Sequence, residues 1–68
     1  MYQEITAERF EQLVKMINFL ESIDNVKTKF FSEMEGMKEG VEVICIRTHH
    51  VIMTLLKNNP ERTFFMKE

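Results

Sequence analysis

Two adjacent histidines, His49 and His50, are the first residues in this sequence whose type could support chemistry. Successive residues of a helix project about 100° apart, so the two imidazoles cannot readily share a metal ion, whereas histidines at i and i+4 can. The sequence supplies no CxxC pair and no acidic cluster to complete a site. We therefore expect no metal and no cofactor, and we interpret both histidines as structural or interfacial.

Cys45 is the single cysteine, and it lies on the apolar side of the stretch around it. We expect a buried thiol that packs as a small hydrophobic group. A nucleophilic thiol would need a nearby base and an accessible, electropositive setting, which the sequence does not show. Both glycines lie in the segment EGMKEG, which lacks the Gly-Lys-Ser/Thr ending of a phosphate-binding loop. The sequence therefore offers no candidate catalytic residue, and we expect that the protein is not an enzyme.

A polar row runs beside these residues if the stretch is helical. Its members repeat every three or four positions: Arg47, His50, Thr54 and Lys57. We interpret this row as a possible polar contact surface. If neighbouring subunits contributed Arg47, His50 and Lys57, the three cations would line a pocket for an anion. This gives an alternative function, an oligomeric protein that binds a small ligand or nucleotide.

The elements that position these side chains follow from apolar periodicity. Between residues 41 and 58 the apolar residues recur at helical spacing, which predicts a helix, although the valine, isoleucine and threonine content favours a strand. A first helix is expected over residues 6–23, with Thr6 as its N-cap. A second is expected over residues 26–38, and residues 60–68 form an apolar tail that docks on the helices or on a neighbouring chain.

These elements predict one all-α domain over residues 1–68, a small helical bundle or hairpin completed by oligomerisation. The alternative is an α+β fold with an N-terminal helix and a small antiparallel sheet. In that alternative a strand at residues 27–31 pairs with residues 41–47 through a turn at residues 35–40.

The first helix carries more apolar surface than one core stripe requires. Beyond the stripe that runs from Phe10 to Leu20, three further residues share a second face: Met16, Phe19 and Ile23. A small monomer rarely leaves such a face in water. These side chains are therefore the predicted self-association residues, and a two-fold dimer is the simplest closed arrangement.

Composition limits the remaining possibilities. A chain of 68 residues buries only about 60% of its unfolded surface, so a monomer is marginal. The net charge of −2 is too small for a nucleic-acid-binding surface. The sequence contains neither a signal-peptide pattern nor an apolar run long enough to span a membrane. With one cysteine, it fits a reducing, cytoplasmic compartment.

These observations favour a non-enzymatic protein-interaction module. We expect a regulator or inhibitor that binds an unknown partner protein and acts by steric occlusion. The small size, single cysteine and abundance of methionine and phenylalanine have the general character of small phage-encoded or regulatory proteins. No residue motif in the sequence supports a particular family.

Overall fold

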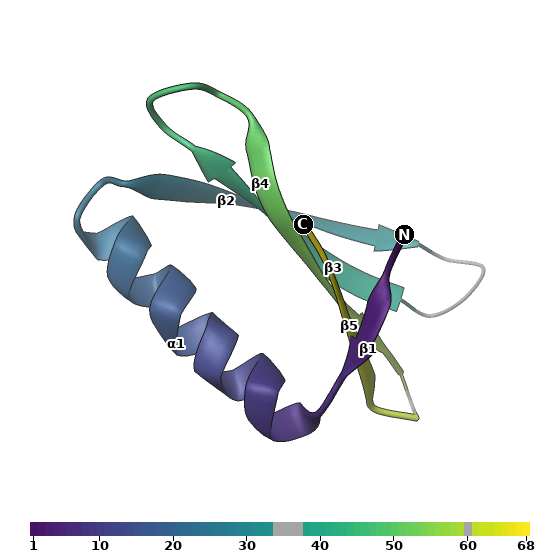
Figure 1. The fold of residues 1–68 in the computed structure, drawn as a ribbon. Coiled ribbons are helices and arrows are strands. Elements are labelled where there is room, and N and C mark those ends of the chain that lie inside the picture. The colour runs from purple at the N-terminus through teal and green to yellow at the C-terminus, as the bar shows by residue number, and fades with distance from the viewer. Residues whose placement is uncertain (34–37, 60) are drawn as a thin grey trace.

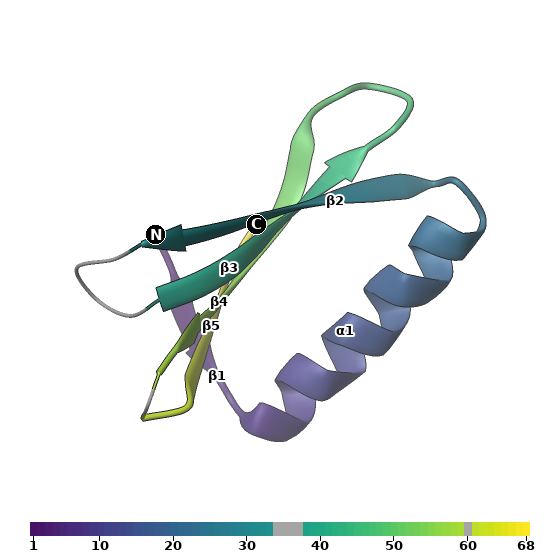
Figure 2. The same cartoon turned by 180° about the vertical axis from the view of Figure 1, so that it is seen from behind.

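The described residues form one helix packed on a five-stranded antiparallel sheet. The computed structural model describes residues 1–33, 38–59 and 61–68. Its elements are β1 (Gln3–Ile5), α1 (Ala7–Ser22), β2 (Val26–Glu33), β3 (Lys38–Cys45), β4 (Val51–Asn58) and β5 (Thr63–Lys67). The strand order is β1-β5-β4-β3-β2, so β1 and β2 form the two edges. Figures 1 and 2 show α1 on one side of the twisted sheet.

The predicted all-α bundle is therefore wrong, and the α+β alternative is confirmed. The helix expected over residues 26–38 is replaced by β2 and the start of β3, and residues 34–37 lie outside the described residues. The helix expected over residues 41–58 is β3, a turn and β4. In the sheet, residues 27–31 pair with residues 40–44, close to the pairing of the alternative.

The N-terminal helix forms where the sequence predicts it. Thr6 is extended and its hydroxyl accepts a hydrogen bond from the Arg9 N–H at 3.0 Å, so one of the otherwise unpaired N-terminal amides is satisfied. At the other end, Asp24 adopts a left-handed conformation with φ of 58°. The Asn25 N–H then donates to the Leu20 carbonyl at 2.9 Å, which turns the chain out of α1 and into β2.

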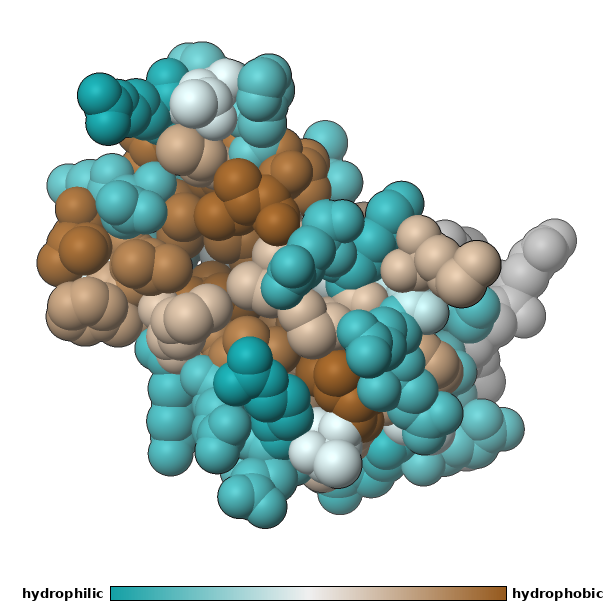
Figure 3. Space-filling model, in the orientation of Figure 1, coloured by the Kyte–Doolittle hydropathy of each residue, from teal (hydrophilic) through white to brown (hydrophobic). Residues whose placement is uncertain are grey.

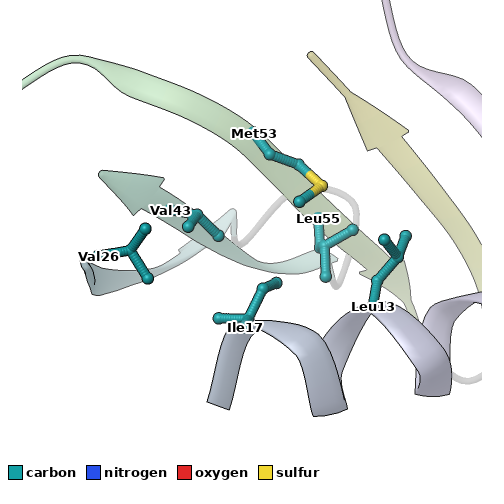
Figure 4. Close-up of a cluster of buried hydrophobic side chains, with 6 residues drawn as sticks. All are labelled: Leu13, Ile17, Val26, Val43, Met53 and Leu55. Atoms are coloured by element: carbon teal, nitrogen blue, oxygen red, sulfur yellow. The ribbon is translucent and has the colours of Figure 1, made fainter. Parts of the chain in front are cut away.

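The core lies between α1 and the sheet. Figure 4 shows side chains from the helix and from three strands pointing toward one another. The cluster consists of Leu13, Ile17, Val26, Val43, Met53 and Leu55. Val43 is 0% exposed, and Leu55 and Val26 are each 1% exposed. Because each large apolar side chain contributes about 1.5–3 kcal/mol when fully buried, this cluster is the main stabilising contact between the two layers.

The C-terminal tail is strand β5, whose two phenylalanines face opposite sides of the sheet. The buried Phe64 ring lies 4.5 Å from the Phe10 ring of α1, measured between centroids. The expected docking of the tail on a helix is thus seen for Phe64, while Pro60 lies outside the described residues. Phe65 lies in a row across the outer face with Leu56, Gly40 and Phe31.

No helix in residues 1–33, 38–59 or 61–68 is long and apolar enough to cross a membrane.

Candidate interaction surfaces

The turn between β3 and β4 holds the residues that first suggested chemistry. Two backbone hydrogen bonds close the turn: the Cys45 N–H donates to the His50 carbonyl at 2.9 Å, and the His49 N–H donates to the Cys45 carbonyl at 2.8 Å. His49 adopts a left-handed conformation with φ of 63° to complete the turn. Both histidines are exposed. Within the described part of the chain, no three His, Cys, Asp or Glu side chains gather where they could hold a metal.

Cys45 is only half-buried, so the expectation of a fully buried thiol is wrong. Hydrogen bonds from the Thr48 side chain, and then from the Thr48 and Arg47 backbone, lower the pKa of the Cys45 thiol. The positive charge of Arg47 acts in the same direction, and desolvation opposes it. The thiolate is the reactive form of cysteine, so this setting favours modification.

The predicted polar row does not exist as one surface, because its spacing was interpreted on a helix. Arg47 and His50 lie in the exposed turn. Thr54 and Lys57 lie on β4, where an odd separation of three residues places them on opposite faces of the sheet. Thr54 is also buried, with 8% exposure. Arg47, His50 and Lys57 therefore form no anion pocket within one chain.

The predicted self-association residues are exposed along one flank of α1. Met16 is 43%, Phe19 62% and Ile23 54% exposed. The β3–β4 turn lies beside the end of the helix, since the Ile46 N–H donates to the Asn25 carbonyl at 3.2 Å. The exposed apolar residues of that turn region are Ile46, Val51 and Ile52.

Figure 3 shows apolar side chains gathered over the C-terminal part of α1 and the neighbouring hairpin. We call this surface the helix–turn patch, and it consists of Met16, Phe19, Ile23, Ile46 and Ile52. Val51 is not part of it, because Val51 pairs with Ile44 on the face of the sheet away from α1. Isolated apolar residues are normal on a protein surface, whereas gathered apolar residues are typical of interaction surfaces.

A second apolar surface lies on the other flank of α1, beside the edge strand β2. It is a groove of about 360 Å³, lined by Phe10, Val14, Ile17, Asn18, Glu21, Thr28, Phe30 and Val41. On its rim, the Thr28 hydroxyl donates to Glu21 Oε2 at 2.9 Å, which ties β2 to the helix. Phe30 is 80% exposed. We call this surface the β2 groove.

Sequence reasoning missed Phe30 because it placed the residue inside a helix. The usable signal was the alternation of Val26, Thr28 and Phe30, which puts all three on one face of a strand. The same alternation places Lys27 and Lys29 on the other face.

In comparisons with family models, curated proteins and solved structures, the chain matches none of them.

Proposed function

We propose that the protein is a non-enzymatic protein-interaction module that binds a partner protein through the helix–turn patch. The observation that carries the proposal is the exposure of five large apolar side chains, three on α1 and its C-cap and two near the β3–β4 turn. An apolar cluster of this kind is stabilised when a partner removes it from water.

The proposed mechanism is steric occlusion. The α1 flank is part of a regular helix whose opposite face is anchored in the core by Leu13 and Ile17. The patch is therefore preorganised, and binding requires little ordering of the backbone. A regulator or inhibitor built this way covers a surface of its target and needs no turnover. Its single cysteine fits a reducing, cytoplasmic compartment.

Affinity capture from native lysate tests the proposal, with wild-type protein and Phe19→Ser as baits. Phe30→Ser is the matched control, because it removes an exposed phenylalanine outside the patch. We expect a protein retained by wild type and by Phe30→Ser. Once that protein is purified, Phe19→Ser should weaken its binding by about 10-fold or more.

Equal binding by Phe19→Ser would contradict the proposed surface. If neither wild type nor Phe30→Ser retains a protein from the lysate, the proposed function is contradicted.

A further inference from the structure

We propose that two copies of this chain pair through their β2 strands, antiparallel and centred on Phe30, to form a continuous ten-stranded sheet. The occupant of the β2 groove is then the Phe30 region of the second copy. This dimer is independent of the helix–turn patch, which lies on the other flank of α1.

The position of β2 in the sheet supports this proposal. β2 is eight residues long and pairs with β3 on one side only, whereas the opposite edge, β1, has three residues. Every second residue of an edge strand presents its backbone N–H and C=O groups outward, where another strand can pair with them. Proline, a covering element or charged side chains commonly block a long, open edge. The described residues of β2 contain no proline, and its two lysines, Lys27 and Lys29, lie on the face away from α1.

Side-chain exposure points to the same edge. Phe30 is 80% exposed although it lines the groove between the sheet and α1. A smaller cavity of about 150 Å³ adjoins the groove, and Phe10, Phe30 and Val41 line both. A second phenylalanine ring placed beside Phe30 would contact this apolar lining.

The β2 sequence is self-complementary in one register. When Phe30 of each copy lies opposite Phe30 of the other, Thr28 lies opposite Ser32, and Lys29 lies opposite Phe31. The register thus combines one aromatic pair on the two-fold axis with two hydroxyl pairs and two cation–π pairs that the axis relates.

Neighbouring registers are less favourable. A shift of one residue pairs strand positions of opposite parity, which puts the helices of the two copies on opposite faces of the sheet. A shift centred on Lys29 places two like charges directly opposite, which is destabilising. A shift centred on Phe31 leaves fewer described β2 residues paired and uses a ring that already covers Gly40.

Sedimentation equilibrium from low to high micromolar concentration provides the first test. We expect wild type to dimerise and Phe30→Ser to weaken dimerisation by about 100-fold or more, because two large apolar side chains are lost at the interface. Phe19→Ser should dimerise like wild type. The exposed position of Phe30 predicts an unchanged circular dichroism spectrum for Phe30→Ser, which checks that the variant is folded.

Disulfide cross-linking tests the register while Phe30 is retained. Thr28→Cys and Ser32→Cys are made separately in a Cys45→Ala background. Directly opposite residues of an antiparallel pair have Cα atoms about 4.5–5.5 Å apart, within the range of a disulfide. Under mild oxidation a mixture of the two variants should give a covalent dimer, and each variant alone should not.

A wild-type monomer throughout the concentration range would overturn the proposal and leave β2 open to a strand from a different protein. Dissociation by Phe19→Ser rather than Phe30→Ser would overturn it in favour of the helix–turn patch. A dimer without cross-linking in the mixture would overturn the proposed register.

Discussion

The ring of Phe31 lies over the backbone of Gly40 on the outer face of the sheet. A Cβ atom at position 40 would lie 2.6 and 2.7 Å from Cε1 and Cε2 of Phe31, and closer still to Cζ. Glycine is therefore required for this contact because of space, since its backbone is not left-handed. The ring fills the gap between β2 and Leu56, which is 6% exposed although it lies on the face away from α1.

This contact predicts that the effect of Gly40→Ala on the free energy of unfolding changes sign when the Phe31 ring is removed. In wild type, Gly40→Ala should lower the free energy of unfolding by about 1–3 kcal/mol, because the Phe31 ring must move. In a Phe31→Ala background, the same substitution should raise it by about 0.5–1 kcal/mol, because alanine is more favourable than glycine inside a strand. Urea unfolding of the four proteins measures both effects. Equal effects of Gly40→Ala in the two backgrounds would show that the ring does not restrict position 40.

The outer row also explains why the sequence predicted helices where the chain forms strands. Val41 and Val43 face α1, whereas Ile44 and Leu56 lie on the opposite face. Apolar and polar residues therefore occur on both faces of these strands, and the sequence does not alternate between them. The register shift at Val43/Ile44 changes the alternation again in β4. Strand periodicity is clear only when one face is polar, and this sheet has apolar residues on both.

The candidate surfaces were predictable to different degrees for the same reason. Because α1 forms as expected, its helical periodicity separates Met16, Phe19 and Ile23 from the core stripe. The contribution of Ile46 and Ile52 depends on the β3–β4 turn, which brings that part of the chain beside the end of α1. No local pattern in the sequence predicts this long-range contact.

The turn geometry predicts an unusual reactivity for Cys45. Thr48 hydrogen bonds lower the pKa of the Cys45 thiol, so the alkylation rate should rise with pH at a lower midpoint than for an unperturbed thiol. Thr48→Val should raise that midpoint, whereas Thr48→Ser, which keeps the hydroxyl, should leave it nearly unchanged. The pKa of the Cys45 thiol is lower in the folded than in the unfolded protein, so ionisation of the thiol stabilises the fold as the pH rises above the folded-state pKa. Well below that pKa, the thiol adds no such stability. Iodoacetamide labelling as a function of pH measures the midpoints, and identical midpoints for Thr48→Val and wild type would contradict the assignment.

The left-handed backbone of His49 predicts that glycine is preferred at this position. A side chain with a Cβ atom costs about 1–2 kcal/mol in that conformation, partly offset by the greater entropy of glycine in the unfolded chain. His49→Gly should therefore raise the free energy of unfolding by about 0.5–1 kcal/mol, and His49→Val should lower it. His50→Gly is the matched control, because His50 has no positive φ, and it should be destabilising. If both glycine variants change the urea midpoint alike, the left-handed strain is not the cause.

Phe10 and Phe64 join α1 to β5, and their coupling tests the docking of the tail on the helix. The ring centroids are 4.5 Å apart at an interplanar angle of 35°, and Phe64 is 6% exposed. Aromatic pairs in such tilted contacts contribute about 0.5–1.5 kcal/mol beyond the area they bury. We expect an interaction energy of about that size from a cycle of Phe10→Leu, Phe64→Leu and the double variant, measured by urea unfolding.

Phe65 is the internal control, because it neighbours Phe64 in the chain but faces the other side of the sheet. Phe10→Leu and Phe65→Leu should add within about 0.3–0.5 kcal/mol. Equal coupling of Phe10 to both residues would mean that β5 does not present Phe64 alone to the helix.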